Sequence, residues 1–203
     1  MFITFEGPEG SGKTTQIALL AEKLTSLGRK VVTTRQPGGD ELGAKLRALM
    51  LDKSALVIEP MAELLMMMAD RAQSVSRIIR PALDSSAIVL CDRYADSSIA
   101  YQGYGHGIEI ETVHALNRIA VAGLMPDLTV LLDIEPRVGL QRQPNHNNME
   151  ARGYEFHRRV RDGYIRIAQA EPSRFVVIDA ANPIAAVSAE VWRAYEAHHS
   201  DRA

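Results

Sequence analysis

The segment from Gly7 to Thr14 constrains this chain more than any other feature. It reads Gly-Pro-Glu-Gly-Ser-Gly-Lys-Thr and directly follows the apolar run from Phe2 to Phe5. It therefore fits the pattern G-x-x-x-x-G-K-[ST], which requires a strand before it and a helix after it. Glycines let the backbone curl until its N–H groups converge on a polyphosphate. The segment predicts a phosphate-binding loop, and the alternative is a turn with a solvated lysine.

The last residues of this loop and the helix that follows have expected tasks. Lys13 supplies a positive charge to the terminal phosphates, and the hydroxyl of Thr14 is a ligand for Mg²⁺. A helix expected from about Thr14 to Leu27 presents its positive N-terminus to the same anion. The residues expected to bind the nucleotide are Gly7, Pro8, Glu9, Gly10, Ser11, Gly12, Lys13, Thr14 and Thr15.

Composition sets modest limits on the class of protein. The 203 residues are 46% hydrophobic and 24% charged, which fits one domain spanning residues 1–203. A formal net charge of -2 argues against nucleic acid as the main partner, and no apolar run approaches the ~18 residues of a membrane span. The single cysteine, Cys91, can form no internal disulfide, so we expect a cytoplasmic protein. Its place at the end of an apolar strand favours a core residue over a reactive thiol.

Short β-branched runs alternate with helical patterns along the chain. The expected strands are Phe2 to Phe5, Lys30 to Thr34, Ala87 to Cys91, Leu128 to Ile134 and Arg174 to Ile178. The long segments between them have amphipathic helical periods, so the crossovers are long and the strands run mainly parallel. The sequence therefore predicts an α/β fold, a mainly parallel five-stranded sheet with helices on both faces.

Charged residues follow two of these strands. In such a sheet, ligands bind outside the carboxyl ends of the strands. Arg35 follows the second strand, and Asp92 and Arg93 follow the third. Asp92 can hold Mg²⁺ directly or through water, and Arg93 can bind a second phosphate. The alternative is a surface ion pair between these two residues.

A helix expected from about Pro60 to Arg80 gives a second clue. Its apolar stripe, expected to face the core, consists of Met61, Leu64, Leu65, Met68, Ala72, Val75 and Ile79. Met67 and Arg71 are one turn apart and share a face at the border of this stripe. Arg71 is thus a candidate to read a base or a phosphate, with a solvated arginine as the alternative.

Five segments in order give the chain a family resemblance over nearly its whole length. It resembles the thymidylate kinases, which are P-loop nucleoside monophosphate kinases that transfer the γ-phosphoryl group of ATP to thymidine monophosphate. The segments are Phe5 to Thr15, Thr34 to Gly39, Ala69 to Gln73, Asp92 to Gly103 and Phe156 to Tyr164. The Arg-x-Pro-Gly-Gly turn and the Asp-Arg-Tyr segment make this resemblance much more specific than the loop alone.

The resemblance implies roles in binding the acceptor nucleotide. Arg35 and Arg93 would hold its phosphate, and Glu9 would meet the 3′-hydroxyl of its sugar. Arg71 would hydrogen-bond the edge of thymine.

Four further residues are implied in the acceptor site. Ser98 and Gln102 fall at positions that look like base or phosphate contacts, and Tyr101 would lie under the sugar, where relatives disfavour a 2′-hydroxyl. Met67 replaces the aromatic ring that many relatives stack on thymine. A thioether can still pack on a ring face, so base selectivity is a softer expectation here.

Phosphoryl transfer requires two anions in line and neutralisation of the charge on the transferred group. Lys13, the loop N–H groups and Mg²⁺ on Thr14 and Asp92 would serve ATP, while two arginines serve the acceptor. The attacking phosphate oxygen is already anionic, so no strong general base is needed. The expected catalytic residues are Lys13, Asp92, Arg93 and Arg142.

One charge is missing from the loop itself. Relatives with a glycine at the position of Gly10 usually supply an arginine from a mobile lid with a sequence close to Asp-Arg-x-Glu. Here that stretch falls at 147–150, so Asn148 stands where the arginine is expected, within a lid of about 141–153. Arg142 and Arg152 flank it, and we favour Arg142 because it leaves a helix behind the strand that ends near Asp133.

Other features predict less. His106, His146, His198 and His199 have no metal-ligand companions at useful spacing and are expected at the surface. The helix expected from Pro183 to His198 looks like packing that closes the sheet. A homodimer is implied by the resemblance only. The alternatives are a kinase for another nucleoside or nucleoside monophosphate, and an ATP-binding module that has lost transfer.

Overall fold

Five parallel strands form the sheet, in the order β2-β3-β1-β4-β5. The computed structural model describes residues 1–52, 57–142 and 152–200. The strands are β1 (Phe2–Glu6), β2 (Val31–Arg35), β3 (Ile88–Asp92), β4 (Leu128–Asp133) and β5 (Phe175–Asp179). Each lies within one residue of its expected bounds, so the prediction of a parallel five-stranded sheet is confirmed.

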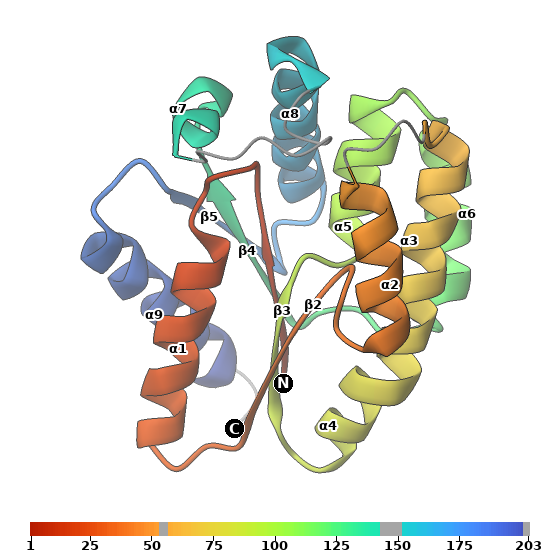
Figure 1. The fold of residues 1–203 in the computed structure, drawn as a ribbon. Coiled ribbons are helices and arrows are strands. Elements are labelled where there is room, and N and C mark those ends of the chain that lie inside the picture. The colour runs from red at the N-terminus through yellow and green to blue at the C-terminus, as the bar shows by residue number, and fades with distance from the viewer. Residues whose placement is uncertain (53–56, 143–151, 201–203) are drawn as a thin grey trace.

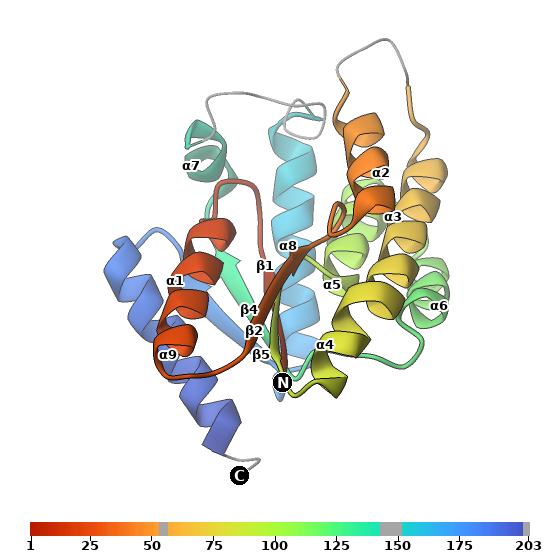
Figure 2. The same cartoon turned by 60° about the horizontal axis from the view of Figure 1, so that its bottom comes forward.

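Helices cover both faces of this sheet (Figures 1 and 2). α1 (Lys13–Ser26) and α9 (Ile184–Ser200) pack together on one face. The other face carries α3 (Pro60–Ser74), α4 (Arg80–Asp84), α5 (Ala95–Ser98), α6 (Ile110–Val121) and α8 (Tyr154–Ala170). α2 (Glu41–Leu51) packs on α3, and Asp40 caps its N-terminus by accepting a hydrogen bond from the Gly43 N–H (2.8 Å).

Side chains alternate between the two layers along each strand, as the pleat requires. Ile3 and Phe5 lie in the core shared with α1 and α9, while Phe2 lies in the core on the opposite face. The C-terminal helix closes the first core as expected, with Val187, Val191, Trp192 and Tyr195 packed there. Cys91 is fully buried, and burial raises the pKa of its thiol, so the expectation of a core residue is confirmed.

The loop between β1 and α1 lies at the carboxyl end of the sheet, beside α7 (Pro136–Gln141) and the start of α8 (Figures 1 and 2). Two glycines allow backbone to meet backbone here. A Cβ on Gly10 would come 2.0 Å from the Gly139 carbonyl oxygen, and one on Gly139 would come 2.2 Å from the Glu9 carbonyl oxygen. Both separations are far below van der Waals contact, so α7 rests directly on the loop.

The buried face of α3 differs from the expected stripe. Met61 and Leu65 are 42% and 50% exposed, and Ala72 is exposed too. Met67 and Arg71, expected at the border, are buried together with the polar residues Glu63, Asp70 and Ser74. Hydrogen bonds compensate the loss of water around buried polar side chains. A search for apolar residues at helical spacing does not detect such side chains. Four residues of the expected stripe, Leu64, Met68, Val75 and Ile79, are buried as predicted. The prediction was wrong for Met61, Leu65 and Ala72, because the buried face also takes in the polar residues beside the stripe.

The long helix expected from Pro60 to Arg80 is also interrupted. The π-helical turn η1 (Val75–Ile79) separates α3 from α4, which continues to Asp84. Pro81 follows this turn, and a proline has no N–H for the helical ladder. Widening the preceding turn accommodates it. A second π-helical segment, η2 (Ile99–Gly105), continues α5.

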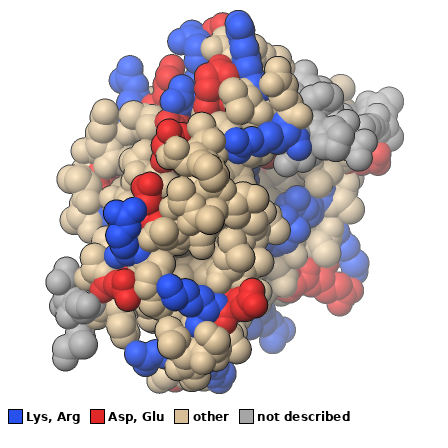
Figure 3. Space-filling model, turned by 90° about the vertical axis from the view of Figure 1, so that its left-hand side faces the viewer, with Lys and Arg blue, Asp and Glu red and all other residues tan. Residues whose placement is uncertain are grey.

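Charges are mixed on the face that carries α1 and α9. Among the described residues, basic and acidic side chains are interspersed there rather than gathered in one basic patch (Figure 3). No helix in the described part of the chain is long and apolar enough to cross a membrane.

Candidate functional site

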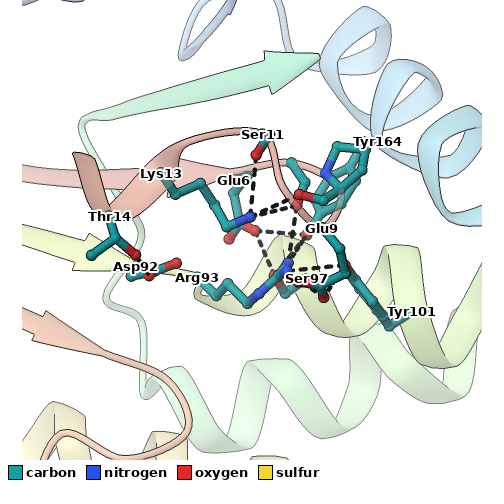
Figure 4. A network of polar contacts seen from close by, with 12 residues as sticks. Glu6, Glu9, Ser11, Lys13, Thr14, Asp92, Arg93, Ser97, Tyr101 and Tyr164 are labelled. Atoms are coloured by element: carbon teal, nitrogen blue, oxygen red, sulfur yellow. Dashed lines mark hydrogen bonds and ion pairs between the residues drawn. The ribbon is translucent and has the colours of Figure 1, made fainter. Parts of the chain in front are cut away.

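Lys13 is the first residue of α1, and its side chain folds back onto the loop (Figure 4). Its Nζ donates to the carbonyl oxygens of Gly7 (3.0 Å) and Pro8 (2.9 Å) and to Ser11 Oγ (3.2 Å). Burial and the positive charge of Arg93 lower the pKa of Lys13 to about 8. A phosphate bound in the loop would raise this pKa again, because a nearby anion favours the protonated amine. The Lys13 amine could then exchange its hydrogen bonds within the loop for hydrogen bonds to phosphate oxygens.

Two oxygen ligands suited to a hard cation lie beside the lysine. Thr14 Oγ1 donates to Asp92 Oδ2 at 3.2 Å, and Arg35 Nη2 lies 3.7 Å from the same carboxylate oxygen. Hydroxyl and carboxylate oxygens are what Mg²⁺ prefers, usually with one or two carboxylates and substrate phosphates completing its shell. The donor set therefore fits Mg²⁺.

Arg93 connects the loop to the neighbouring helix. Its backbone adopts a left-handed conformation (φ 70), which is uncommon for a residue other than glycine. Its guanidinium donates to the Gly7 carbonyl oxygen (3.1 Å), Glu9 Oε1 (2.8 Å), Tyr101 OH (3.0 Å), Tyr164 OH (3.0 Å) and Ser97 Oγ (3.3 Å) (Figure 4). A strained backbone held by so many contacts is typical of a functional position.

Glu9 points from the loop into this cluster. Its Oε1 accepts from Arg93 and from Tyr101 OH (2.9 Å). Burial alone would raise the pKa of Glu9, but Arg93 and Lys13 lower it to about 2. Glu9 is therefore an ionised carboxylate at neutral pH, and it can only accept hydrogen bonds.

A second carboxylate, Glu6, contacts two residues of the Arg93 cluster, Ser97 and Tyr164. The sequence analysis did not predict it as a site residue. Its Oε1 accepts from the Tyr94 N–H (2.7 Å), and its Oε2 accepts from Ser97 Oγ (2.5 Å) and Tyr164 OH (2.9 Å). Burial and nearby Asp96 raise the pKa of Glu6. Glu6 ends β1, so the strand-end argument could have found it. Tyr164 lies far along the chain, and nothing in its local pattern signals the contact.

Arg71 is fully buried and makes four hydrogen bonds to oxygen, which excludes the solvated alternative. Its Nε donates to Gln36 Oε1 (2.9 Å), its Nη2 to the Tyr94 carbonyl oxygen (2.8 Å), and its Nη1 to Ser98 Oγ (3.0 Å) and Asn117 Oδ1 (2.7 Å). A guanidinium carries five N–H groups. One of them, on Nη2, has no partner among the residues that the structure describes.

Several predicted residues meet around one pocket of ≈ 550 Å³, a volume that includes its open side. Its lining comprises Glu9, Pro37, Arg47, Met50, Leu51, Met67, Arg93, Ser97, Tyr101 and Gln102. We call it the acceptor pocket. Arg35 lines an adjoining pocket with Thr14 and Asp92. Ser98 is fully buried and does not line the acceptor pocket.

Arg47 lines the acceptor pocket but was not predicted from the sequence, because a lone arginine on α2 resembles any solvated arginine. It donates to the Pro37 carbonyl oxygen (3.1 Å).

A third pocket lies beside the loop, and we call it the donor pocket. It is lined by Gly10, Ser11, Gly12, Thr15, Gln16, Arg142, Ala180, Ala181, Asn182, Pro183, Ile184 and Val187. Arg142 caps the end of α7 and donates to the carbonyl oxygens of Ala180 (3.0 Å) and Gly10 (3.5 Å). Arg152 is elsewhere, paired with Glu63 at 2.5 Å. Asn148 and most of the expected lid lie outside the described residues, as does His146.

His106 is not the surface residue expected from the sequence. Its side chain is only 17% exposed and lies 3.7 Å from Glu63, against Arg152 and the ring of Phe156. Phe156 lies far along the chain, so sequence spacing gave no sign of this packing.

The chain is similar in sequence and in structure to known thymidylate kinases. The thymidylate kinase family model matches residues 5–191. A thymidylate kinase of Solidesulfovibrio magneticus is 50% identical over 202 residues, covering 95% of this chain and 97% of the relative. One from Deinococcus radiodurans is 48% identical over 197 residues, covering 96% and 95%. The crystal structure of a thymidylate kinase from Ehrlichia chaffeensis superposes with a TM-score of 0.80 at 39% identity, covering 97% of this chain and 98% of that one.

Proposed function

The chain belongs to the thymidylate kinase family, and on that premise we propose how its residues divide the work of the reaction. The protein is an enzyme that transfers the γ-phosphoryl group of ATP to thymidine monophosphate, giving ADP and thymidine diphosphate. Thymidine diphosphate is one phosphorylation short of dTTP, so the reaction serves dTTP synthesis. The residue roles, the metal, the location and the assembly below are our proposals.

The donor half of the site is the loop with the pocket beside α9. Lys13 and the loop N–H groups bind the ATP phosphates, exchanging their present internal acceptors for phosphate oxygens. Thr14 and Asp92 would hold Mg²⁺, which would supply positive charge next to the donor phosphates. The 3.2 Å approach of their oxygens supports this assignment.

The acceptor half is built on Arg93 and Arg35. Their guanidinium groups hold the acceptor phosphate, and Glu9 accepts a hydrogen bond from the 3′-hydroxyl of the sugar, above Tyr101. The phosphate oxygen is already anionic, so catalysis depends on position and electrostatics rather than on a general base. Arg47 adds a further positive charge to the lining of the acceptor pocket.

We assign the base end of the acceptor pocket to Met67 and Gln102, which line it, and to Arg71 and Ser98, which are fully buried and hydrogen-bonded to each other. The remaining N–H of Arg71 donates to a carbonyl group on the thymine edge, while Ser98 holds the guanidinium in place. Met67 lines the pocket and packs its thioether on the base, where an aromatic ring would stack.

One observation supports the two-anion proposal above all others. Arg93 bonds both to the Gly7 carbonyl oxygen in the loop and to Tyr101 and Glu9 in the acceptor pocket. A single cation thus contacts both the donor loop and the acceptor pocket.

The alternative substrates are tested by measuring turnover of the four common deoxynucleoside monophosphates with ATP. We expect strong preference for thymidine monophosphate. Preference for another monophosphate would identify a different kinase, and ATP binding without ADP release on adding any of them would identify a binding module.

Arg142 supplies the charge that the loop lacks. It lines the donor pocket with Gly10 and Ser11, whereas Arg152 is engaged by Glu63. We expect Arg142→Ala to lower kcat by about 10²-fold with little change in either KM, because the arginine acts on the transferring group. Steady-state kinetics of Arg142→Ala and Arg152→Ala give the comparison. A larger loss of kcat in Arg152→Ala would assign the charge to that residue.

Arg71→Ala tests the base contact. We expect KM for thymidine monophosphate to rise by about 10²-fold while KM for ATP changes little, because the lost donor faces only the acceptor base. The variant also removes the partner of Gln36 and Asn117, so its thermal unfolding must be measured alongside. Equal effects on both KM values in a folded variant would remove Arg71 from the base pocket.

We propose that the enzyme works in the cytoplasm as a homodimer. The single buried cysteine is consistent with a reducing compartment. Sedimentation of the purified protein tests the dimer.

A further inference from the structure

Glu63 is a buried carboxylate to which the reaction as described gives no task. It lies one turn of α3 before Met67, beside the acceptor pocket, and its side chain is 4% exposed. Donors from two other regions converge on it. Gln102 Nε2 donates to its Oε1 at 2.7 Å, and Arg152 Nη2 donates to its Oε2 at 2.5 Å. The His106 Nε2 lies 3.7 Å from Oε1.

The ionisation of Glu63 decides which way the Gln102 amide faces. Burial would raise the pKa of Glu63, but hydrogen bonds from His106 and Arg152 lower it to about 2. At neutral pH the group is therefore a carboxylate, which only accepts hydrogen bonds. The NH₂ group of Gln102 must face it, and the carbonyl oxygen of Gln102 must face the other way.

That carbonyl oxygen is free for a ligand. Gln102 is 1% exposed and lines the acceptor pocket, yet its Oε1 has no hydrogen-bond partner among the residues that the structure describes. A buried acceptor without a partner is unfavourable, so a ligand that brings an N–H to this oxygen binds more tightly than one that does not.

We propose that Glu63 is a positioning residue, which holds the Gln102 carboxamide so that its oxygen accepts a hydrogen bond from a ring N–H of the acceptor base. The inference rests on the proposed function. Thymine carries a hydrogen on N3, whereas cytosine has a lone pair there, which would face the Gln102 oxygen as a second acceptor. Arg71 discriminates in the same sense, since it can donate to the thymine carbonyl but not accept from the cytosine amine. Glu63 thus selects between bases that it does not touch.

The test is Glu63→Gln, which keeps the shape of the side chain but lets it donate as well as accept. Two acceptors of nearly the same shape are compared, thymidine monophosphate and 5-methyldeoxycytidine monophosphate. We expect the ratio of their kcat/KM values to fall by at least about 10-fold, through a higher KM for thymidine monophosphate, since the Gln102 amide can now rotate. The kcat at saturation and KM for ATP should stay within about threefold of wild type.

Three variants complete the experiment. Glu63→Asp keeps an acceptor-only carboxylate and should retain more of the selectivity than Glu63→Gln. Glu155→Gln alters an exposed carboxylate that also pairs with an arginine, at 2.9 Å from Arg158, and should leave all constants unchanged. Gln102→Leu should lose the selectivity by itself, and adding Glu63→Gln to it should change nothing further, because the two residues act as one unit.

Each failure has a distinct signature. No preference for thymidine monophosphate in the wild-type enzyme would contradict the proposed function. If folded Glu63→Gln keeps the wild-type preference for thymidine monophosphate, the role of Glu63 is overturned while the proposed function stands. The same holds if the effects of Glu63→Gln and Gln102→Leu on the kcat/KM ratio are fully additive. Should Glu63→Gln not fold, NMR of the wild-type complex with ¹⁵N-labelled thymidine monophosphate decides. We expect its N3 proton to be protected from exchange with water, and an exchanging proton would overturn the inference.

Discussion

Lys13→Ala should reduce kcat/KM for ATP by about 10³-fold or more while the protein stays folded. Removing a positioned cation from the transferring phosphates costs several kcal/mol of transition-state stabilisation in related chemistries. The fold should survive because the lysine is a buried charge whose pKa burial has already lowered to about 8. Steady-state kinetics and thermal unfolding measure the two effects, with Lys23→Ala on the same helix as control. Wild-type turnover in Lys13→Ala would contradict the assignment of the phosphate loop.

The pH dependence gives this prediction a second readout. The pKa of Lys13 in the folded protein, about 8, lies below its ordinary value of 10.5. Between these values the unfolded chain binds more protons than the folded one, so the lysine adds stability as pH rises through this window. Lys13→Ala should lack that rise. In the wild-type enzyme KM for ATP should increase above pH 8, because the neutral amine must regain a proton to bind phosphate.

Gly10→Arg should inactivate the enzyme instead of supplying its missing arginine. A Cβ at this position would meet the Gly139 carbonyl oxygen at 2.0 Å, and the backbone is in the left-handed region (φ +71). Backbone cannot move aside as a flexible side chain can, so α7 would be forced off the loop together with Arg142. We expect a loss of about 10³-fold in kcat/KM and a loss of stability of about 3 kcal/mol or more.

Gly28→Arg is the matched control for that variant. Gly28 has a similar φ of +76, but nothing lies within 4 Å of a Cβ placed there. The stability of Gly28→Arg should fall only by the cost of a left-handed backbone, about 1–2 kcal/mol, and its activity should be retained. Thermal unfolding and kinetics of both variants separate strain from collision. A Gly10→Arg enzyme as active and stable as Gly28→Arg would show that α7 is not fixed against the loop.

The sequence predicted the sheet well because its signal is local. Short β-branched runs marked each strand to within one residue of its bounds, and the phosphate loop indicated which strand begins the fold. The strand-end rule brought Arg35, Asp92 and Arg93 to one edge, where they lie. These patterns need no knowledge of distant contacts.

The supporting residues of the site escaped prediction because their role depends on tertiary contacts. Glu63 is polar and lies outside the expected apolar stripe of α3, and Arg71 was predicted as a candidate base reader at the border of that stripe but not as a fully buried residue. Hydrogen bonds to residues far along the chain, such as Arg71 to Asn117 at 2.7 Å, make that burial possible. No periodicity within one helix can reveal partners that lie on another.

The short helix formed by α5 and η2 links two kinds of specificity. Ser97 and Tyr101 serve the cluster of Arg93 at the sugar and phosphate end, while Ser98 and Gln102 serve Arg71 and Glu63 at the base end. Adjacent residues on one rigid helix cannot shift independently. A sequence change that re-tilts this helix to admit another sugar therefore also displaces the groups that read the base. In the descent of such enzymes, tolerance for new sugars and tolerance for new bases should be inherited together.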